Sequence, residues 1–467
     1  MGKGEELHME LEFDRDVIHC WEIAADGTLC QEETLETIVP DACPDILRIV
    51  AVCGQATLNG KQAREGAAAV SGSVRAVLLY QPEEGGGLRR MEAALPFSAQ
   101  MEAPGLTEQG QVHACVRLRG AEARALNPRK VLLRADLAVD VTALQPRERV
   151  CCQGVLDPEA HGVQQRMTEQ ESYQLEAVQE KPFTFSEQVR LNVGQGEPVQ
   201  LAACRENLPF SQIMEVPGLG EGGECRMAVE LTQLSCQPAG EDGRTVEVVL
   251  DLLAQAQVWS RRPVTLLQDL YSTALQTQVE REEQVLWQLV EQSSRTQNVR
   301  ELMETGALPR SVTDSWVSLG EIRRSREGDQ LVLEGEARVT VLYLDENDAL
   351  QALQRPLTVS CRLDAPEGAR CCCRAACSGE VFAAPSAGGI EVRFAVDFQF
   401  LILRERHTTA VCGAVLGEPR TRGEGDQPSV VLRLASPGEG LWELAKAYGT
   451  TTEQIVQANG LEEGQLP

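Results

Sequence analysis

The sequence predicts a mainly β protein, built from tandem antiparallel β-modules and a small α+β module at its C-terminal end. Three observations support this prediction. Apolar and polar residues alternate through much of the chain, the alternating segments recur as a set, and the pattern changes to helical spacing near the C-terminus. The length of 467 residues agrees with about three domains.

Alternation is the signal for the strands. Every second position is apolar in three segments, at residues 331–343, 390–400 and 246–258. Because successive side chains of a strand point to opposite faces, this pattern is typical of half-buried antiparallel sheet.

Residues 269–304 are ambiguous. Their Glu, Gln, Arg and Leu content suits a helix, whereas Val285, Trp287 and Leu289 alternate as in a strand. Helix and strand are therefore both open for this segment, with which we expect the third module to begin.

The alternating strands recur within the chain. Residues 72–80 match residues 335–343 in register, residues 95–105 match residues 208–218, and a weaker third copy follows Pro356. Each copy closes on a strand that carries one acid, at Asp136, Asp251 or Asp397. The middle copy is short, because it has no counterpart of residues 72–80.

This self-similarity predicts the domain organisation. We expect a first β-module at residues 1–162, a shortened second at 163–272 and a third at 273–416. Residues 417–428 are rich in Gly, Pro, Arg and Glu without periodicity, which indicates a linker. Residues 429–467 form the α+β module.

Composition excludes several classes of function. The 70 acidic residues outnumber the 43 basic ones, for a net charge of -27. Nucleic acids and anionic membranes are bound through clustered Lys and Arg, so neither is an expected partner. The acidic start of the chain lacks an apolar run, and we find no stretch of about 18 apolar residues. We therefore expect a cytosolic protein without membrane insertion, whose 16 cysteines are reduced thiols.

The cysteine cluster Cys371, Cys372, Cys373 and Cys377 raises the question of a metal or redox site. Its spacing is poor for a metal, because neighbours on a strand point to opposite faces. We interpret these cysteines as small apolar residues, with oxidative crosslinking and metal binding as alternatives. We expect no metal site and no cofactor.

Catalytic residues are not expected either. The five histidines are scattered, and the chain has no hydrolase motif. One acid per module on an alternating strand, as at Asp136, Asp251 and Asp397, is typical of a cross-strand or solvent-facing residue. We therefore predict a protein that is not an enzyme.

The C-terminal segment has a different pattern. A short strand at residues 430–434 precedes a helix whose apolar face is spaced at i, i+3, i+4 and i+7, at Leu441, Leu444, Ala445 and Tyr448. Gly449 occupies the expected left-handed C-cap position. Residues 450–453 form a capping-box pattern that opens a second helix, which ends at Asn459 and Gly460.

This segment resembles the LysM module. Residues 437–461 follow the pattern Pro-Gly-Asp-Thr-Leu-Trp-x-Ile-Ala-x-x-Tyr-Gly-Thr-Thr and later Asn-Gly-Leu, except that the family's Asp-Thr is Glu-Gly here. The final family strand is missing or cut short. The resemblance implies binding of N-acetylglucosamine polymers in a groove between the first loop and the loop after the second helix. The implied partner- or glycan-binding residues are Gly438, Glu439, Gly440, Leu441, Asn459, Gly460 and Leu461. Trp442 lies within the apolar band of the first helix, so we expect it in the module core, with a platform for a ligand as the alternative.

The upstream repeats resemble the SPOCS domain of spore-coat proteins from endospore-forming bacteria. The resemblance rests on the Gly-x-x-x-Val-x-Leu-Tyr strand, the Leu-Pro-Phe-Ser…Pro-Gly strand, and Leu-Gln-Asp-Leu-Tyr-Ser at residues 267–272. It implies a non-enzymatic scaffold of coat assembly in the mother-cell cytoplasm, at the forespore surface. The implied partners are the coat-basement ATPase and other coat proteins. The alternative is a LysM protein that binds peptidoglycan.

Overall fold

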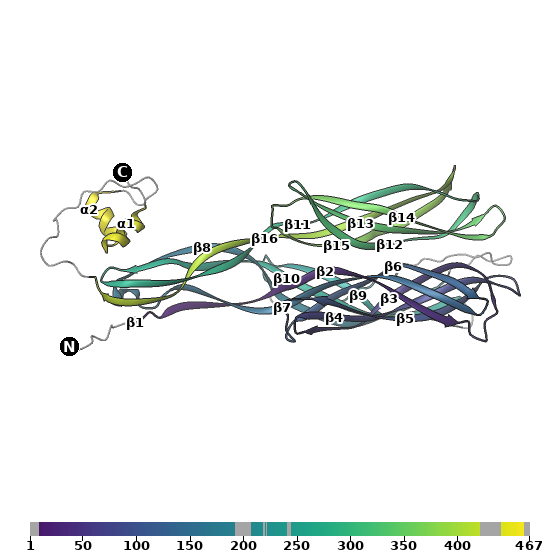
Figure 1. The fold of residues 1–467 in the computed structure, drawn as a ribbon, viewed down its shortest axis with the longest axis horizontal. Helices are drawn as coiled ribbons and strands as arrows, with labels where there is room; N and C mark the ends of the chain where they lie inside the picture. The colour runs from purple at the N-terminus through teal and green to yellow at the C-terminus, as the bar shows by residue number, and fades with distance from the viewer. Residues whose placement is uncertain are drawn as a thin grey trace.

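The computed structural model describes residues 9–191, 207–217, 220, 222–240, 244–420 and 440–461. Within these residues the chain forms antiparallel sheets, and two short helices lie near its C-terminal end. Figure 1 shows an elongated β body with the helices at one end. The predicted fold class, mainly β with a small α+β module, is thereby confirmed.

Six long strands form the framework of the body. They pair antiparallel as β2 (Phe13–Ile38) with β7 (Lys130–Val155), β8 (Val163–Arg190) with β10 (Thr245–Ser272), and β11 (Leu275–Glu304) with β16 (Gly389–Pro419). The short β1 (Met9–Glu10) adds to β16. A short 3-10 helix, η1 (Pro158–His161), connects β7 to β8. Of the ambiguous residues 269–304, 269–272 end β10, 273–274 form the connection, and 275–304 are β11, so strand and not helix is correct for this segment.

The remaining strands form two small sheets and three flanking strands. One sheet consists of β3 (Ile46–Arg64), β4 (Ala67–Pro82) and β5 (Arg89–Glu102), and the other of β12 (Pro309–Glu327), β13 (Gln330–Asp345) and β14 (Leu350–Asp364). The flanking strands are β6 (Gln111–Asn127) beside β7, β9 (Glu224–Ala239) beside β10 and β15 (Arg370–Ser386) beside β16. Among the described residues, the middle strand pair has a flanking strand but no three-stranded sheet.

We call each long pair, together with its flanking strand and any three-stranded sheet that covers it, a group of strands. The three groups are not separate domains in space. A six-stranded sheet in the order β6-β7-β2-β8-β10-β9 joins the first group to the second. The third group lies against them, above the other two in Figure 1. The module boundaries at residues 162 and 272 therefore remain predictions from the repeats. The predicted linker at 417–428 begins inside β16, and residues 421–428 lie outside the described residues.

Each long pair carries a β-bulge about midway, between Ile23 and Ala25, between Val258 and Trp259, and between Leu289 and Glu291. A bulge bends a strand and increases its twist. We call the part between these bulges and the helices the stalk, which comprises residues 13–23, 144–155, 163–175, 259–272, 275–289 and 403–419. On the other side of the bulges, the first and third pairs are each covered by a three-stranded sheet.

The stalk has a core to which all three pairs contribute. Ile18 of β2, Val264 of β10 and Leu286 of β11 are at most 2% exposed and belong to one cluster. Nearer the end of the stalk, Leu267 of β10 packs in a cluster with Val411 of β16. Burying such side chains stabilises the fold by about 1.5–3 kcal/mol each. The stalk therefore holds the three strand pairs together.

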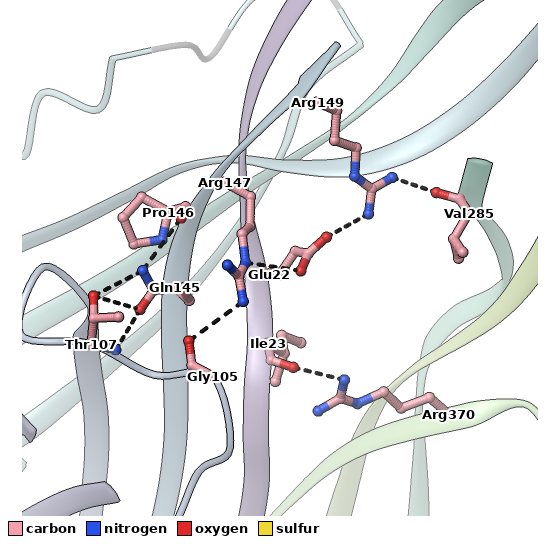
Figure 2. A network of polar contacts seen from close by, with 10 residues as sticks. All are labelled: Glu22, Ile23, Gly105, Thr107, Gln145, Pro146, Arg147, Arg149, Val285 and Arg370. Carbon is pink, nitrogen blue, oxygen red and sulfur yellow. Dashed lines mark hydrogen bonds and ion pairs between the residues drawn. The ribbon is translucent and has the colours of Figure 1, made fainter. Parts of the chain in front are cut away.

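Polar contacts join the first and third groups where the stalk meets the wider part of the body (Figure 2). Arg149 of β7 donates to the Glu22 carboxylate at 2.6 Å and to the Val285 carbonyl of β11 at 2.5 Å. Arg370 of β15 donates to the Ile23 carbonyl of β2 at 2.9 Å. Because a backbone carbonyl is a fixed acceptor, these bonds set the position of one group against the other.

The three recurring acids each lie on one strand of a long pair, Asp136 on β7, Asp251 on β10 and Asp397 on β16. Asp251 and Asp397 each accept a hydrogen bond from the threonine directly opposite on the partner strand, at 2.6 and 2.5 Å. The prediction of cross-strand residues is confirmed for these two. Asp136 pairs with Arg338 of β13, at 3.4 Å, and so links the first group to the third.

The cysteine cluster lies on β15. Cys371 faces the core under the three-stranded sheet β12-β13-β14, whereas Cys372 faces the core between the strand pairs. Burial raises the pKa of Cys371 and Cys377 to about 11 and that of Cys372 and Cys373 to about 12. These values disfavour the thiolate, which is the form that binds metals. In the described part of the chain, no group of three or more His, Cys, Asp or Glu residues could hold a metal ion.

No helix within the described residues has the length and apolar character needed to cross a membrane.

Close backbone approach explains one glycine of the repeats. A Cβ at Gly72 would overlap the Thr57 carbonyl of β3 and the Phe97 ring of β5. At the matching position of the third group, a Cβ on Gly335 would lie 2.5 Å from Ile322 Cδ1 and 3.0 Å from the Glu321 carbonyl. A large side chain thus covers each of the two glycines and leaves no room for a Cβ atom at either position.

We predict that Gly72→Ala lowers the free energy of unfolding by about 1–3 kcal/mol, because the added methyl forces the sheet apart. The matched control is Gly86→Ala, at which a Cβ would meet no atom within 4 Å. Urea unfolding monitored by circular dichroism measures the difference. Equal midpoints for the two variants would contradict the close packing at Gly72.

Candidate functional site

The described part of the α+β module, residues 440–461, is here called the head. It consists of α1 (Leu441–Tyr448) and α2 (Thr452–Asn459). Leu444 and Ala445 form the buried face of α1, and Gly449 ends this helix with φ 61°. Both helices therefore lie where the spacing predicts them.

The start of α2 differs from the prediction by one residue. The N-cap is Thr451, whose hydroxyl accepts the backbone N–H of Gln454, and the Gln454 side chain in turn accepts the Thr451 backbone N–H. The predicted capping box at residues 450–453 is therefore wrong in register. A glutamine at the third helical position closes a capping box as well as a glutamate does. The helix ends at Gly460, with φ 61°, as predicted.

The implied groove residues lie at the ends of the two helices. Gly440 is the N-cap of α1 and provides no capping side chain, and Leu441 is the first residue of that helix. Asn459, the last residue of α2, and Gly460 are exposed, while Leu461 follows half-buried. Gly438, Glu439 and the strand predicted at 430–434 lie outside the described residues.

The head docks on the end of the stalk through α1. Trp442 Nε1 donates to Asp269 Oδ2 of β10 at 2.9 Å, and Lys446 Nζ lies 2.8 and 2.7 Å from the two carboxylate oxygens. Arg281 of β11 donates to Oδ1 at 2.6 Å. The Asp269 side chain is only 11% exposed. One nearly buried carboxylate thus joins the head to two strands of the stalk.

Aromatic and cationic side chains surround the same contact. The Trp442 ring meets the Tyr271 ring edge-on, with centroids 5.0 Å apart, and the Arg166 guanidinium lies 5.3 Å from the Trp442 ring centre. Arg166 also pairs with Glu443 at 3.1 Å. The placement of Trp442 in the module core is therefore wrong, because its indole lies in the contact with the stalk and finds its hydrogen-bond acceptor there.

The C-terminal end of α1 is held as well. Tyr271 Oη donates to the Thr450 carbonyl at 2.8 Å. Arg420, which follows β16, donates to the Lys446 carbonyl at 3.0 Å. The last carbonyls of a helix lack intrahelical partners and carry partial negative charge, so a guanidinium at this end is stabilising.

Asp269 directly follows a second bulge of its strand pair. Each long pair has a bulge near the end of the stalk, and the residue that follows the bulged one is Gly154 in β7, Asp269 in β10 and Gly413 in β16. The repeat thus has glycine at this position in two copies. The second copy, β10, has the acid that receives the head. In the sequence, Asp269 and Tyr271 stand out only as members of the SPOCS-like motif. The change from glycine to an acid at this position of the repeat is the signal that could have identified Asp269 as a contact residue.

The surroundings of Asp269 favour its charged form. Burial alone raises the pKa of this carboxyl. The hydrogen bonds from Lys446 and Trp442 and the positive charges of Lys446 and Arg281 outweigh burial and hold its pKa below the ordinary value of 3.8. A charge-assisted contact of this kind is stronger than a neutral hydrogen bond.

Comparison with protein families agrees with the geometry of the head. The family model of the LysM domain matches residues 436–466. Comparison with curated proteins and with solved structures finds no significant match. This segment is therefore a LysM domain, a class of module that binds N-acetylglucosamine polymers such as peptidoglycan.

We predict that docking of the head on the stalk depends on pH only under acidic conditions. Since the pKa of Asp269 is depressed in the docked state, the stabilisation is fully present above the ordinary value of 3.8 and is lost as the pH falls through the depressed pKa. Protein with ¹⁵N-labelled tryptophan gives five indole signals, of which Trp442→Phe identifies one. That signal should move only below about pH 4. A change centred near neutral pH would contradict this assignment.

We also predict that Asp269→Asn weakens docking by about 1 kcal/mol, a modest value because Lys446 is partly exposed. The undocked population then rises roughly fivefold. Hydrogen exchange of residues 441–448, followed by mass spectrometry, measures this rise. The matched control is Asp251→Asn, which removes the same charge from the same strand outside the head contact. Equal exchange in the two variants would show that Asp269 does not hold the head.

Proposed function

We propose that this protein is a non-enzymatic binding protein whose LysM head engages an N-acetylglucosamine polymer. The observation that carries the proposal is the orientation of the docked head. Trp442, Glu443 and Lys446 of α1 contact the stalk, whereas Asn459 and Gly460 at the end of α2 are exposed. Docking therefore leaves this side of the implied groove accessible.

The chemistry of the helix ends suits a sugar chain. Gly440 contributes no capping side chain, so the first amides of α1 receive no acceptor from the side chain of this residue. An N-acetyl group offers a carbonyl acceptor for such donors. The exposed amide side chain of Asn459 offers a donor and an acceptor at the other helix end. Repeated units along a polymer raise the effective affinity of one small head.

A second candidate function is a scaffold in spore-coat assembly, made in the mother-cell cytoplasm and acting at the forespore surface. Its partners would be the coat-basement ATPase and other coat proteins. The observation that favours it is that Asp269 and Tyr271, which belong to the SPOCS-like motif at residues 267–272, hold the head. Residues of this motif thus join the LysM domain to the β body.

We predict that the full chain sediments with insoluble peptidoglycan, and that Asn459→Ala reduces the bound fraction at least about threefold, the effect of losing one net hydrogen bond. Gln457→Ala is the matched control, because Gln457 is an exposed amide of the same helix. A parallel pull-down uses the purified coat-basement ATPase. Capture of the ATPase without sedimentation would reject glycan binding in favour of the second candidate, and failure of both would reject both.

A further inference from the structure

A polar cleft of about 410 Å³ lies where the three groups of strands meet beyond the stalk. It is lined from all three groups, by strands β2, β6 and β7, by β9 and β10, and by β11, β15 and β16. This volume lies within the usual range for small-molecule sites. Neither the LysM head nor the repeats account for this cleft.

Two arginines give the cleft its charge. Arg226 of β9 and Arg374 of β15 line it, and neither guanidinium forms a hydrogen bond or an ion pair with another described residue. The acid on the wall, Asp26, is already engaged, since Thr142 donates to one oxygen and Arg324 to the other, each at 2.9 Å. The protein carries a net charge of -27, yet this cleft has an excess of positive charge.

The two guanidiniums lie in an unfavourable setting without a ligand. Burial, followed by the like charge of Arg374, lowers the pKa of Arg226, although Asp26 attracts it. Arg374 also lowers the pKa of the buried His113 in the same wall, after the effects of burial and of Lys61, to about 3. A partly desolvated cation without a partner costs free energy, and a bound anion would remove that cost.

Neutral hydrogen-bonding groups surround the arginines. Ser294 of β11 lies exposed on the wall of the cleft, in line across the sheet with Arg374, and has no side-chain hydrogen bond to another described residue. Deeper in the wall, the amides of Gln255 and Gln257 are already paired, with Ala114 and with His113. A free hydroxyl next to free guanidiniums suits a ligand that carries both a hydroxyl and negative charge.

We propose that this cleft binds a small hydroxylated anion, whose carboxylate or phosphate group is held between Arg226 and Arg374 and one of whose hydroxyls meets Ser294. The planar guanidinium fork matches both kinds of oxyanion. The excess of positive charge excludes a neutral sugar as the preferred ligand. The cleft is distinct from the LysM head, so the anion and a glycan polymer occupy different sites.

Calorimetric titration of the full chain tests the proposal, with inorganic phosphate, citrate and glucose 6-phosphate as probes and glucose as the neutral comparison. We expect at least one anion to bind with a dissociation constant in the micromolar to millimolar range and glucose to show no binding. Arg226→Gln and Arg374→Gln should each weaken the binding at least tenfold. Absence of binding by all three anions at millimolar concentrations would overturn the proposal.

A matched control separates the site from general electrostatics. Arg124→Gln removes one exposed positive charge from β6 outside the cleft and should leave the affinity unchanged. Arg226→Gln should also leave the melting temperature of the ligand-free protein unchanged or higher, because it removes an unpaired cation. Equal affinities for Arg226→Gln and the wild type would overturn the site. Peptidoglycan sedimentation of Arg226→Gln should equal that of the wild type, which distinguishes this inference from the proposed function.

Discussion

Each of the three long strand pairs has an apolar face that the other two pairs help to cover. Ile18, Val264 and Leu286 come from different pairs and meet in one buried cluster. If one pair left this cluster, the remaining side chains would be exposed to water, at a cost of about 25 cal/mol for each Å² of apolar surface. The three groups of strands therefore form one structural unit, in contrast to domains that are joined by flexible linkers.

Both functional features follow from this assembly. At one end, the stalk brings Asp269 and Arg281 together from two strand pairs, and the head docks on Asp269. At the other side of the bulges, Arg226 and Arg374 approach from the flanking strands of two different groups and form the wall of one cleft. A module folded alone would have neither site. The repeats thus serve as parts of a shared body. Single positions differ between the copies where a residue makes a contact that its counterparts do not make.

Much of the fold could be predicted from the sequence, because its signals are local. Alternation identified the strands, and the helix ends near Gly449 and Gly460 followed from their spacing and glycines. Residues 269–304 remained open, because a strand with an exposed face contains many Glu, Gln and Arg residues, which also favour helices. The hydrophobic partners that decide such a segment lie elsewhere in the chain.

The sites were harder to predict than the fold. The contact between Trp442 and Asp269 joins residues that are far apart in sequence, so the spacing within the head assigned Trp442 to the wrong environment. The net charge of -27 correctly describes the chain as a whole, but it conceals the local excess of arginine in the cleft. Local charge depends on which strands meet, and neither composition nor periodicity contains that information.

The interdependence of the three groups of strands is tested most directly by differential scanning calorimetry of the full chain at neutral pH. The shared stalk core predicts that the β body unfolds in one cooperative transition, with a calorimetric enthalpy equal to the van't Hoff enthalpy. Three separate transitions, one for each group of strands, would contradict the account.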